Sequence, residues 1–160
     1  MSHVDYMARN MNNEDRMEVY ASYMVKPETA LRVSIGNSTK AWTVLLDGKP
    51  EFAFGVSWFK RMSGVGAPWM LGTGEVKKIY VPFLRQGRDY VDMMIDEYDS
   101  LENYVSTWNK TSIKWLKFLG FDILDSEPYG PFGYKFHKFT MEKAPCVWQQ
   151  QPQPQQQAAV

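Results

Sequence analysis

Apolar residues recur with a helical period in the first part of the chain, and the period changes further on. Asn12 and Asn13 are suitable helix caps, and acidic residues follow them, as is typical of a helix N-terminus. Pro27 fits the first turn of a second helix, which Gly36 can end. The apolar positions on one face of the first helix are Met17, Tyr20, Ala21 and Met24.

The next part of the chain has the pattern of β-strands. The runs 41–46 and 51–58 are β-prone, and Asp47-Gly48 between them is a hairpin signal. Residues 69–71 are consistent with a short third strand that Gly72-Thr73-Gly74 closes. The preceding loop is indicated by Gly64, Gly66 and Pro68.

A long apolar stripe then runs from Val76 to Tyr98, and Pro82 within it predicts a kink or two helices. Residues 102–108 are strand-like, and Asn109 can cap a helix that stops at Gly120. The remaining elements are a strand at 121–124, a Pro/Gly loop at 127–133 and a final strand from 134 to about 141.

This order of elements predicts an α+β fold, in which helices flank a mixed, mostly antiparallel sheet. One strand-helix-strand unit can pair in parallel. We expect a single domain over residues 1–144 and a Gln/Pro-rich tail, 145–160, that is disordered when free. The side chains expected to be mainly buried are Trp42, Phe54, Tyr104, Leu116 and Phe121.

Composition narrows the functional classes. The 160 residues are 44% apolar, and eighteen basic residues balance eighteen acidic ones, which argues against a general nucleic-acid binder. The single cysteine, Cys146, excludes an internal disulfide, so we expect folding in a reducing cytoplasm. Neither a signal peptide nor a membrane span is expected. His3 and His137 are isolated, and we expect no metal site.

The stretch from Asn109 to Phe121 resembles the C-terminal signature of GNAT acetyltransferases: Asn, two residues, a small residue, an aliphatic one, then a short helix that ends in Gly-Phe. The chain from about Asn13 to Met141 resembles that GNAT fold. Four segments of the chain also resemble a phage family: 41–48, 69–73, 102–105 and 127–133. The best-known members of that family are internal virion proteins of podoviruses, the short-tailed bacteriophages.

The GNAT resemblance implies that the pantetheine arm of acetyl-CoA fits between two diverging central strands. Backbone N–H groups at the next helix start would hold its pyrophosphate. The nearest match to the family's pyrophosphate loop, 85–90, lacks the required glycines and has helical spacing. The candidate cofactor contacts therefore fall into two sets. The first is Gly72, Thr73 and Gly74, which could instead form a plain strand-to-helix turn. The second is Asn109 with Ser112, where Asn109 could instead serve only as a helix cap.

The same resemblance implies a catalytic acid and a base. The family's acid tyrosine falls on Leu116, which cannot donate a proton. Tyr104, Tyr129 or Tyr134 could replace it if the fold brought one to the sulfur. Glu102 is the one candidate base, although surface glutamates are common, and the catalytic residues stay unknown.

Three functions compete. The first is a virion-associated protein that is made in the host bacterial cytoplasm and contacts other virion proteins. Its GNAT fold would be catalytically degenerate and would need no cofactor. The second is an active acetyl-CoA-dependent N-acetyltransferase that modifies a protein amine, and the third is a nucleotide-like ligand binder. Leu116 and the phage resemblance favour the first. The aromatic residues expected at the contact surface are Trp58, Phe59, Trp69, Tyr129, Phe132 and Trp148.

Overall fold

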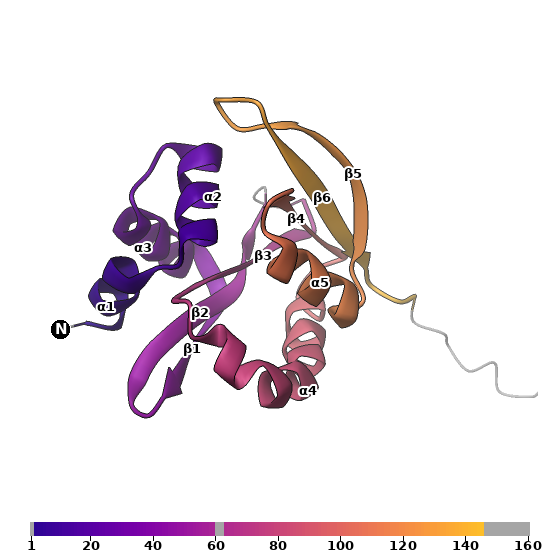
Figure 1. Ribbon diagram of the computed structural model, residues 1–160. Coiled ribbons are helices and arrows are strands. Elements are labelled where there is room, and N and C mark those ends of the chain that lie inside the picture. The colour runs from indigo at the N-terminus through magenta and orange to yellow at the C-terminus, as the bar shows by residue number, and fades with distance from the viewer. Residues whose placement is uncertain (1, 60–62, 146–160) are drawn as a thin grey trace, which may run out of the picture.

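Three helices precede the sheet in the computed structural model (Figure 1): α1 (His3–Asn10), α2 (Asn13–Tyr23) and α3 (Pro27–Asn37). The structure describes residues 2–59 and 63–145, and only the backbone of 76–85. The first helix is an addition to the predicted elements. A capping box between Ser2 and Asp5 starts it.

Two further helices and six strands follow. The helices are α4 (Val76–Ile95) and α5 (Lys110–Leu119). The strands are β1 (Ser38–Leu46), β2 (Lys49–Trp58), β3 (Val65–Gly72), β4 (Ser100–Ser106), β5 (Asp122–Tyr129) and β6 (Tyr134–Glu142). The predicted turn between β1 and β2 is confirmed, with positive φ angles of 49° at Asp47 and 75° at Gly48.

The six strands form one sheet in the order β1-β2-β3-β4-β6-β5. Every pairing is antiparallel except that of β3 with β4, which confirms the predicted α+β class with a mostly antiparallel sheet. The parallel pairing covers only Val65 with Ser100 and Gly66 with Leu101. Beyond these residues β3 and β4 diverge, so the centre of the sheet contains a split.

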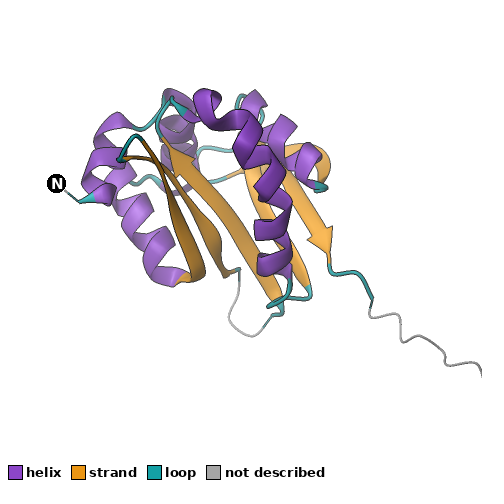
Figure 2. Cartoon of the chain, turned by 90° about the horizontal axis from the view of Figure 1, so that it is seen from below, coloured by secondary structure: helices purple, strands orange, loops and turns teal. Residues whose placement is uncertain are grey.

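Both faces of the sheet are covered by helices (Figure 2). Phe54 and Val56 of β2 pack with Val91 of α4 and Trp115 of α5 in the larger core. On the other face, Ala53 packs with residues of α1 and α3 that include Met7 and Leu31. Because neighbouring residues of β2 point to opposite faces, burial along this strand is continuous.

The structure excludes one of the two alternatives expected at Pro82, and one prediction about β3 is wrong. The helix α4 continues across Pro82, so the alternative of two helices is excluded. The strand β3 includes Gly66 and Pro68, which were expected in a loop. Pro68 is tolerated because its nitrogen is on the side of β3 that faces the split, where the sheet ladder requires no N–H donor.

The boundaries of other strands differ from the expected ones as well. The strand β4 begins two residues earlier than expected, and β5 runs through Pro128 to Tyr129 before a tight turn at 130–133. Pro128 is acceptable because β5 is an edge strand. Of the side chains expected in the core, Phe54 and Phe121 are buried, whereas Trp42, Tyr104 and Leu116 are only partly buried.

The outer face of α2 is apolar and exposed. The residues predicted as one helical stripe include Met17, Tyr20 and Met24, which are all more than half exposed. Val19 and Ala21 are the buried apolar residues of α2. The helix therefore presents its hydrophobic stripe to solvent, and its polar residues Asp15 and Glu18 face inward.

The turn between β5 and β6 packs against α2 at Gly130. Its φ angle is +71°, and a Cβ atom there would lie 2.3 Å from the backbone oxygen of Ala21. We expect Gly130→Ala to lower the free energy of unfolding by about 1–2 kcal/mol, through left-handed strain and this clash. Urea unfolding measures the change. Gly36→Ala, which meets no atom within 4 Å in α3, is the control and should not destabilise the protein.

Candidate functional site

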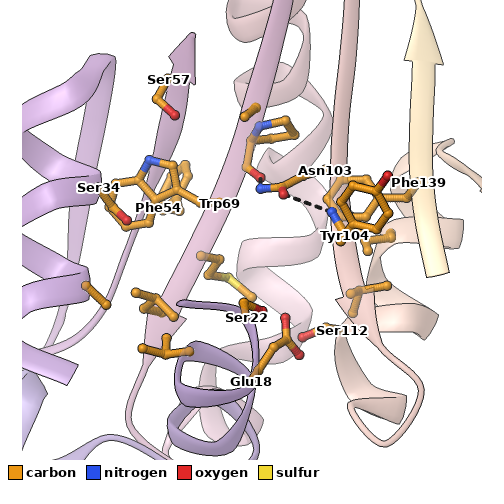
Figure 3. Close-up of a pocket in the computed structure, with 18 of the residues that line it drawn as sticks. Glu18, Ser22, Ser34, Phe54, Ser57, Trp69, Asn103, Tyr104, Ser112 and Phe139 are labelled. Carbon is orange, nitrogen blue, oxygen red and sulfur yellow. Dashed lines mark hydrogen bonds between the residues drawn. The ribbon is translucent and has the colours of Figure 1, made fainter. Parts of the chain in front are cut away.

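A cavity of about 700 Å³ lies at the split between β3 and β4 (Figure 3). Residues of α2 and α3 line it from one face of the sheet, and residues of α4 and α5 line it from the other. Its lining is mainly apolar and aromatic and includes Trp69 and Tyr104, while Glu18 is the acidic group in it. A cavity of this size, with few polar groups, is typical of a small-molecule site or of the remains of one.

The narrow part of the split is bridged by the side chain of Asn103. Its Nδ2 donates to the backbone oxygen of Pro68 on β3 at 2.9 Å, and its Oδ1 accepts from the N–H of Tyr104 on β4 at 2.8 Å. The amide therefore replaces a rung of the sheet ladder where the strands are too far apart to pair. Figure 3 draws Asn103 between the two strands.

The wide end of the split is bridged by the start of α2, first on the β3 side. Gly72, the last residue of β3, donates its N–H to Asp15 Oδ2 at 3.0 Å. Its carbonyl accepts from the backbone N–H and from the side-chain Nδ2 of Asn12, both at 3.0 Å. Asn12 also caps α2, because its Oδ1 accepts from the N–H of Asp15 at 2.8 Å.

Glu18, one turn along α2 from Asp15, completes the bridge on the β4 side. Its Oε2 accepts from Ser106 Oγ at 2.7 Å, from the N–H of Ser106 at 3.3 Å and from Asn109 Nδ2 at 3.1 Å. Asn109 Nδ2 also lies 3.4 Å from Asp15 Oδ1. We call Asn12, Asp15, Glu18, Ser106 and Asn109 the α2 bridge.

Desolvation gives the two carboxyl groups of the α2 bridge unusual electrostatics. It raises the pKa of Asp15 to about 7, and the neighbouring charge of Glu18 acts in the same direction. It also raises the pKa of Glu18, against the bonds from Ser106 and Asn109 that favour the charged form. Both side chains keep some accessible surface. Two carboxyl groups are thus held on neighbouring turns of one helix, where burial favours their neutral forms.

The predicted cofactor contacts do not form one group. Asn109 and Ser112 line the cavity at the split, and Asn109 Oδ1 caps α5 by accepting from the N–H of Ser112 at 3.2 Å. Thr73 and Gly74 instead line a second hollow of about 470 Å³ that also contains Glu51. Thr73 Oγ1 donates to the buried carboxylate of Glu51.

The side chain at the family's acid position faces the cavity and is apolar. Leu116 lines the cavity and packs against the larger core. Tyr104 and Tyr129 also line it and stack on each other with ring centroids 4.0 Å apart. Desolvation raises the pKa of both hydroxyls, which makes them weaker proton donors near neutral pH. Tyr134 is 54% exposed and packs beside Trp108.

The candidate base Glu102 lies elsewhere. It forms an ion pair with Lys138 at 2.7 Å, and it is not among the residues that line the cavity. The sequence reasoning missed Glu18, the cavity's acidic residue. The available signal was two acidic residues three positions apart on a helix, where they share a face.

Neither a cluster of metal-ligating side chains nor a membrane-spanning helix is found among residues 2–59 and 63–145. No group of three or more His, Cys, Asp or Glu side chains is arranged to hold a metal ion there. None of the helices within the described part of the chain is long and apolar enough to cross a membrane.

Solved structures with a similar fold include GNAT acetyltransferases. One, the GNAT-family acetyltransferase from Streptococcus pneumoniae, has 14% sequence identity and a TM-score of 0.55 over 74% of this chain and 75% of that one. Another, the ribosomal-protein-S5-alanine acetyltransferase from Vibrio fischeri, has 15% identity and a TM-score of 0.58 over 89% and 90%. The aminoglycoside acetyltransferase AAC(6')-Ib, solved with coenzyme A, has 13% identity and a TM-score of 0.53 over 81% and 85%.

The sequence itself is similar to a phage family over part of its length. The family described as bacteriophage T7, probable scaffold protein Gp13, matches residues 63–126, which is less than half of the chain. No curated protein matches the sequence. The chain therefore has the GNAT fold, and the segment from before β3 into β5 is similar to a phage scaffold-protein family.

Proposed function

We propose that this chain is a virion-associated protein of a short-tailed bacteriophage that acts by contacting other virion proteins and does not transfer acetyl groups. The observation that carries the proposal is the similarity of residues 63–126 to the phage scaffold-protein family. That segment contains β3 and β4, the two strands of the split, and α4 and α5, which line it from one face of the sheet. The similarity to a structural family therefore falls on the part of the fold where an acetyltransferase would hold its cofactor.

An exposed aromatic surface supports a role in protein contacts. Tyr20 of α2 stacks on Phe132 of the β5–β6 turn with ring centroids 5.5 Å apart, and Phe132 adjoins Tyr134 at 6.0 Å. The α2–hairpin surface consists of Met17, Tyr20, Met24, Phe132 and Tyr134, which are 47–58% exposed. Aromatic and Met side chains are enriched at the centres of protein interfaces.

The aromatic set expected from the sequence is only partly at the surface. Trp58, Phe59 and Phe132 are exposed. Trp69 and Tyr129 are partly buried and line the cavity, where Trp69 Nε1 donates to Ser38 Oγ at 2.8 Å. Trp148 and the remainder of the tail after residue 145 lie outside the described residues. The contact surface proposed here therefore centres on Tyr20 and Phe132.

Mass spectrometry of purified phage particles tests the proposal. We expect peptides of this protein in mature virions at a fixed ratio to the major structural proteins. The proposal fails if the protein is abundant in infected cells and absent from purified particles.

Changing the α2–hairpin surface should affect assembly and leave the fold intact. We expect the double variant Tyr20→Ala, Phe132→Ala to be incorporated into particles at least about tenfold less, since interface aromatic residues often contribute about 2 kcal/mol or more. Its midpoint of urea unfolding should stay close to that of the native chain, because both rings are about half exposed. Quantitative immunoblots of particles measure incorporation.

The matched control for this experiment is Leu45→Ala. Leu45 is a similarly exposed apolar residue on β1, at the other edge of the sheet from β5. Equal losses of incorporation in Leu45→Ala and in the double variant would show that the α2–hairpin surface has no special part in assembly.

The second candidate function is acetyl-CoA-dependent N-acetylation of a protein amine. Glu18 favours it, because a carboxylate whose pKa is raised toward neutral pH and that lines a cavity is suited to act as a base. Asn109, Ser112 and the 72–74 turn would then contact the cofactor. Release of coenzyme A in the presence of host protein, abolished in Glu18→Gln and kept in Glu14→Gln, would establish this function and overturn the first.

A further inference from the structure

We propose that side chains of the protein itself bond backbone groups that face the split between β3 and β4, so that the α2 bridge and Asn103 make the hydrogen bonds that a bound ligand arm would make. This inference rests on the proposed function, in that it gives the physical reason why the fold works without acetyl-CoA. The evidence for it is the hydrogen bonding of the backbone N–H and C=O groups of β3 and β4 that point into the split.

On β3, the alternation of the backbone identifies these groups. The N–H of Thr73 donates to Glu51 on β2, so the N–H and C=O of Gly72 point the other way, into the split. By the same alternation the carbonyl of Pro68 points into the split. Asn103 donates a hydrogen bond to the Pro68 carbonyl. In the α2 bridge, Asp15 accepts from the N–H of Gly72 and Asn12 donates to its carbonyl.

On β4, the same argument applies. The N–H of Thr107 donates to Lys135 on β6 at 3.1 Å, so the N–H of Ser106 faces the split, and so does that of Tyr104 two residues earlier. Glu18 accepts the first and Asn103 accepts the second. A ligand arm that paired with Pro68 or Gly72 on β3, or with the N–H of Tyr104 or Ser106 on β4, would have to displace bonds that the protein already makes.

The start of α2 is also tied to β3 by its backbone. Met11 forms an isolated antiparallel bridge with Thr73, and the N–H of Asn12 donates to Gly72. The α2 bridge is therefore anchored at the strand itself. Displacement of Asp15 and Glu18 from the split would require the loss of these backbone bonds as well.

Above pH 7, where Asp15 ionises, negative charge also opposes an anionic ligand at the same place. Asp15 and Glu18 place two carboxyl groups at the wide end of the split, and Glu51 is buried beneath Thr73 in the turn that leads to α4. Phosphate groups are favoured at a helix N-terminus when the local field is positive. Acidic side chains on both sides of this turn remove that advantage.

Amide NMR of the complete chain tests the inference, with coenzyme A and acetyl-CoA as probes. An N–H that donates to a carboxylate should shift as that carboxylate titrates. We expect the Gly72 resonance to shift with pH around 7, where Asp15 titrates, and to lose this shift in Asp15→Asn. The Ser106 resonance should lose its pH-dependent shift in Glu18→Gln, and Glu14→Gln, an exposed neighbour on α2, should change neither.

Addition of either probe to the native chain should leave the Gly72, Tyr104 and Ser106 resonances in place. Saturable shifts of these three amides with coenzyme A would overturn the inference, and so would the absence of any pH-dependent shift at both Gly72 and Ser106. The native chain alone decides the matter if a variant does not fold. Absence of the protein from phage particles would contradict the proposed function and leave this result unchanged.

Discussion

The stability of the protein is expected to fall by about 2–4 kcal/mol as pH rises from about 4 to about 7, because of Asp15. Desolvation raises its pKa in the folded protein to about 7, from an ordinary value of 3.8. Between these values the folded chain holds a proton that the unfolded chain has lost. Unfolding then releases this proton, so the stabilisation is fully present below pH 4 and is lost as pH approaches 7.

Other shifted carboxyl groups change this expectation little. The pKa of Glu18 is also raised, which adds to the loss. Hydrogen bonds lower the pKa of Asp5 and of Glu97, so these groups act in the opposite direction, mainly below pH 4.5. Both are more open to solvent than the pair in the split, and screening weakens their effect.

Urea unfolding of the native chain and of Asp15→Asn at several pH values measures the effect. The native chain should lose stability across this range relative to the variant, in which residue 15 cannot titrate. Parallel curves, within about 0.5 kcal/mol from pH 4 to pH 8, would show that Asp15 does not hold its proton in the folded state.

Removing the hydroxyl of Ser106 should also have a large effect. Ser106 is fully buried, and its Oγ donates to Glu18 at 2.7 Å. Ser106→Ala removes one of the donors that compensate a desolvated carboxylate, and hydrogen bonds to charged groups contribute about 1.5–3 kcal/mol. We expect the free energy of unfolding to fall by about 2–3 kcal/mol at pH 8 and by less at pH 5, where Glu18 is closer to neutral.

The matched control is Ser126→Ala. Ser126 lies on the exposed edge strand β5, and its substitution should change stability by less than about 0.5 kcal/mol. If Ser106→Ala changes stability no more than Ser126→Ala does, the bond between Ser106 and Glu18 does not contribute to the free energy of unfolding. The proposed connection of the α2 bridge to β4 would then be wrong.

Local sequence signals predicted the elements with clear ends. Asn12 caps α2, Pro27 begins α3 and Asp47-Gly48 turns the first hairpin, and all three were read correctly from residue type and position. Asn109 caps α5, as its side chain predicts. At Pro82 the residue type left two alternatives open, a kink or two helices, because proline kinks or breaks a helix interior, and the continuous helix α4 excludes the second.

The GNAT resemblance implied the split, but the side chains that bridge it could not be predicted, because their contacts join distant parts of the chain. Asp15 lies 57 residues from Gly72, and Glu18 lies 88 residues from Ser106. Helix periodicity placed Met17 and Tyr20 on an apparent inner face, whereas the polar residues of α2 face inward. An apolar stripe shows that a helix has a preferred side, but it does not show whether that side meets this protein's core or another protein.

The measurement that tests the central claim most directly is thermal unfolding of the purified chain with and without acetyl-CoA. If the α2 bridge and Asn103 already bond the backbone groups that a ligand arm would use, acetyl-CoA at millimolar concentration should leave the unfolding temperature unchanged. A ligand that binds the folded state stabilises it by about 2.7 kcal/mol at a hundred times its dissociation constant. A clear, saturable rise in the unfolding temperature with acetyl-CoA would contradict the account.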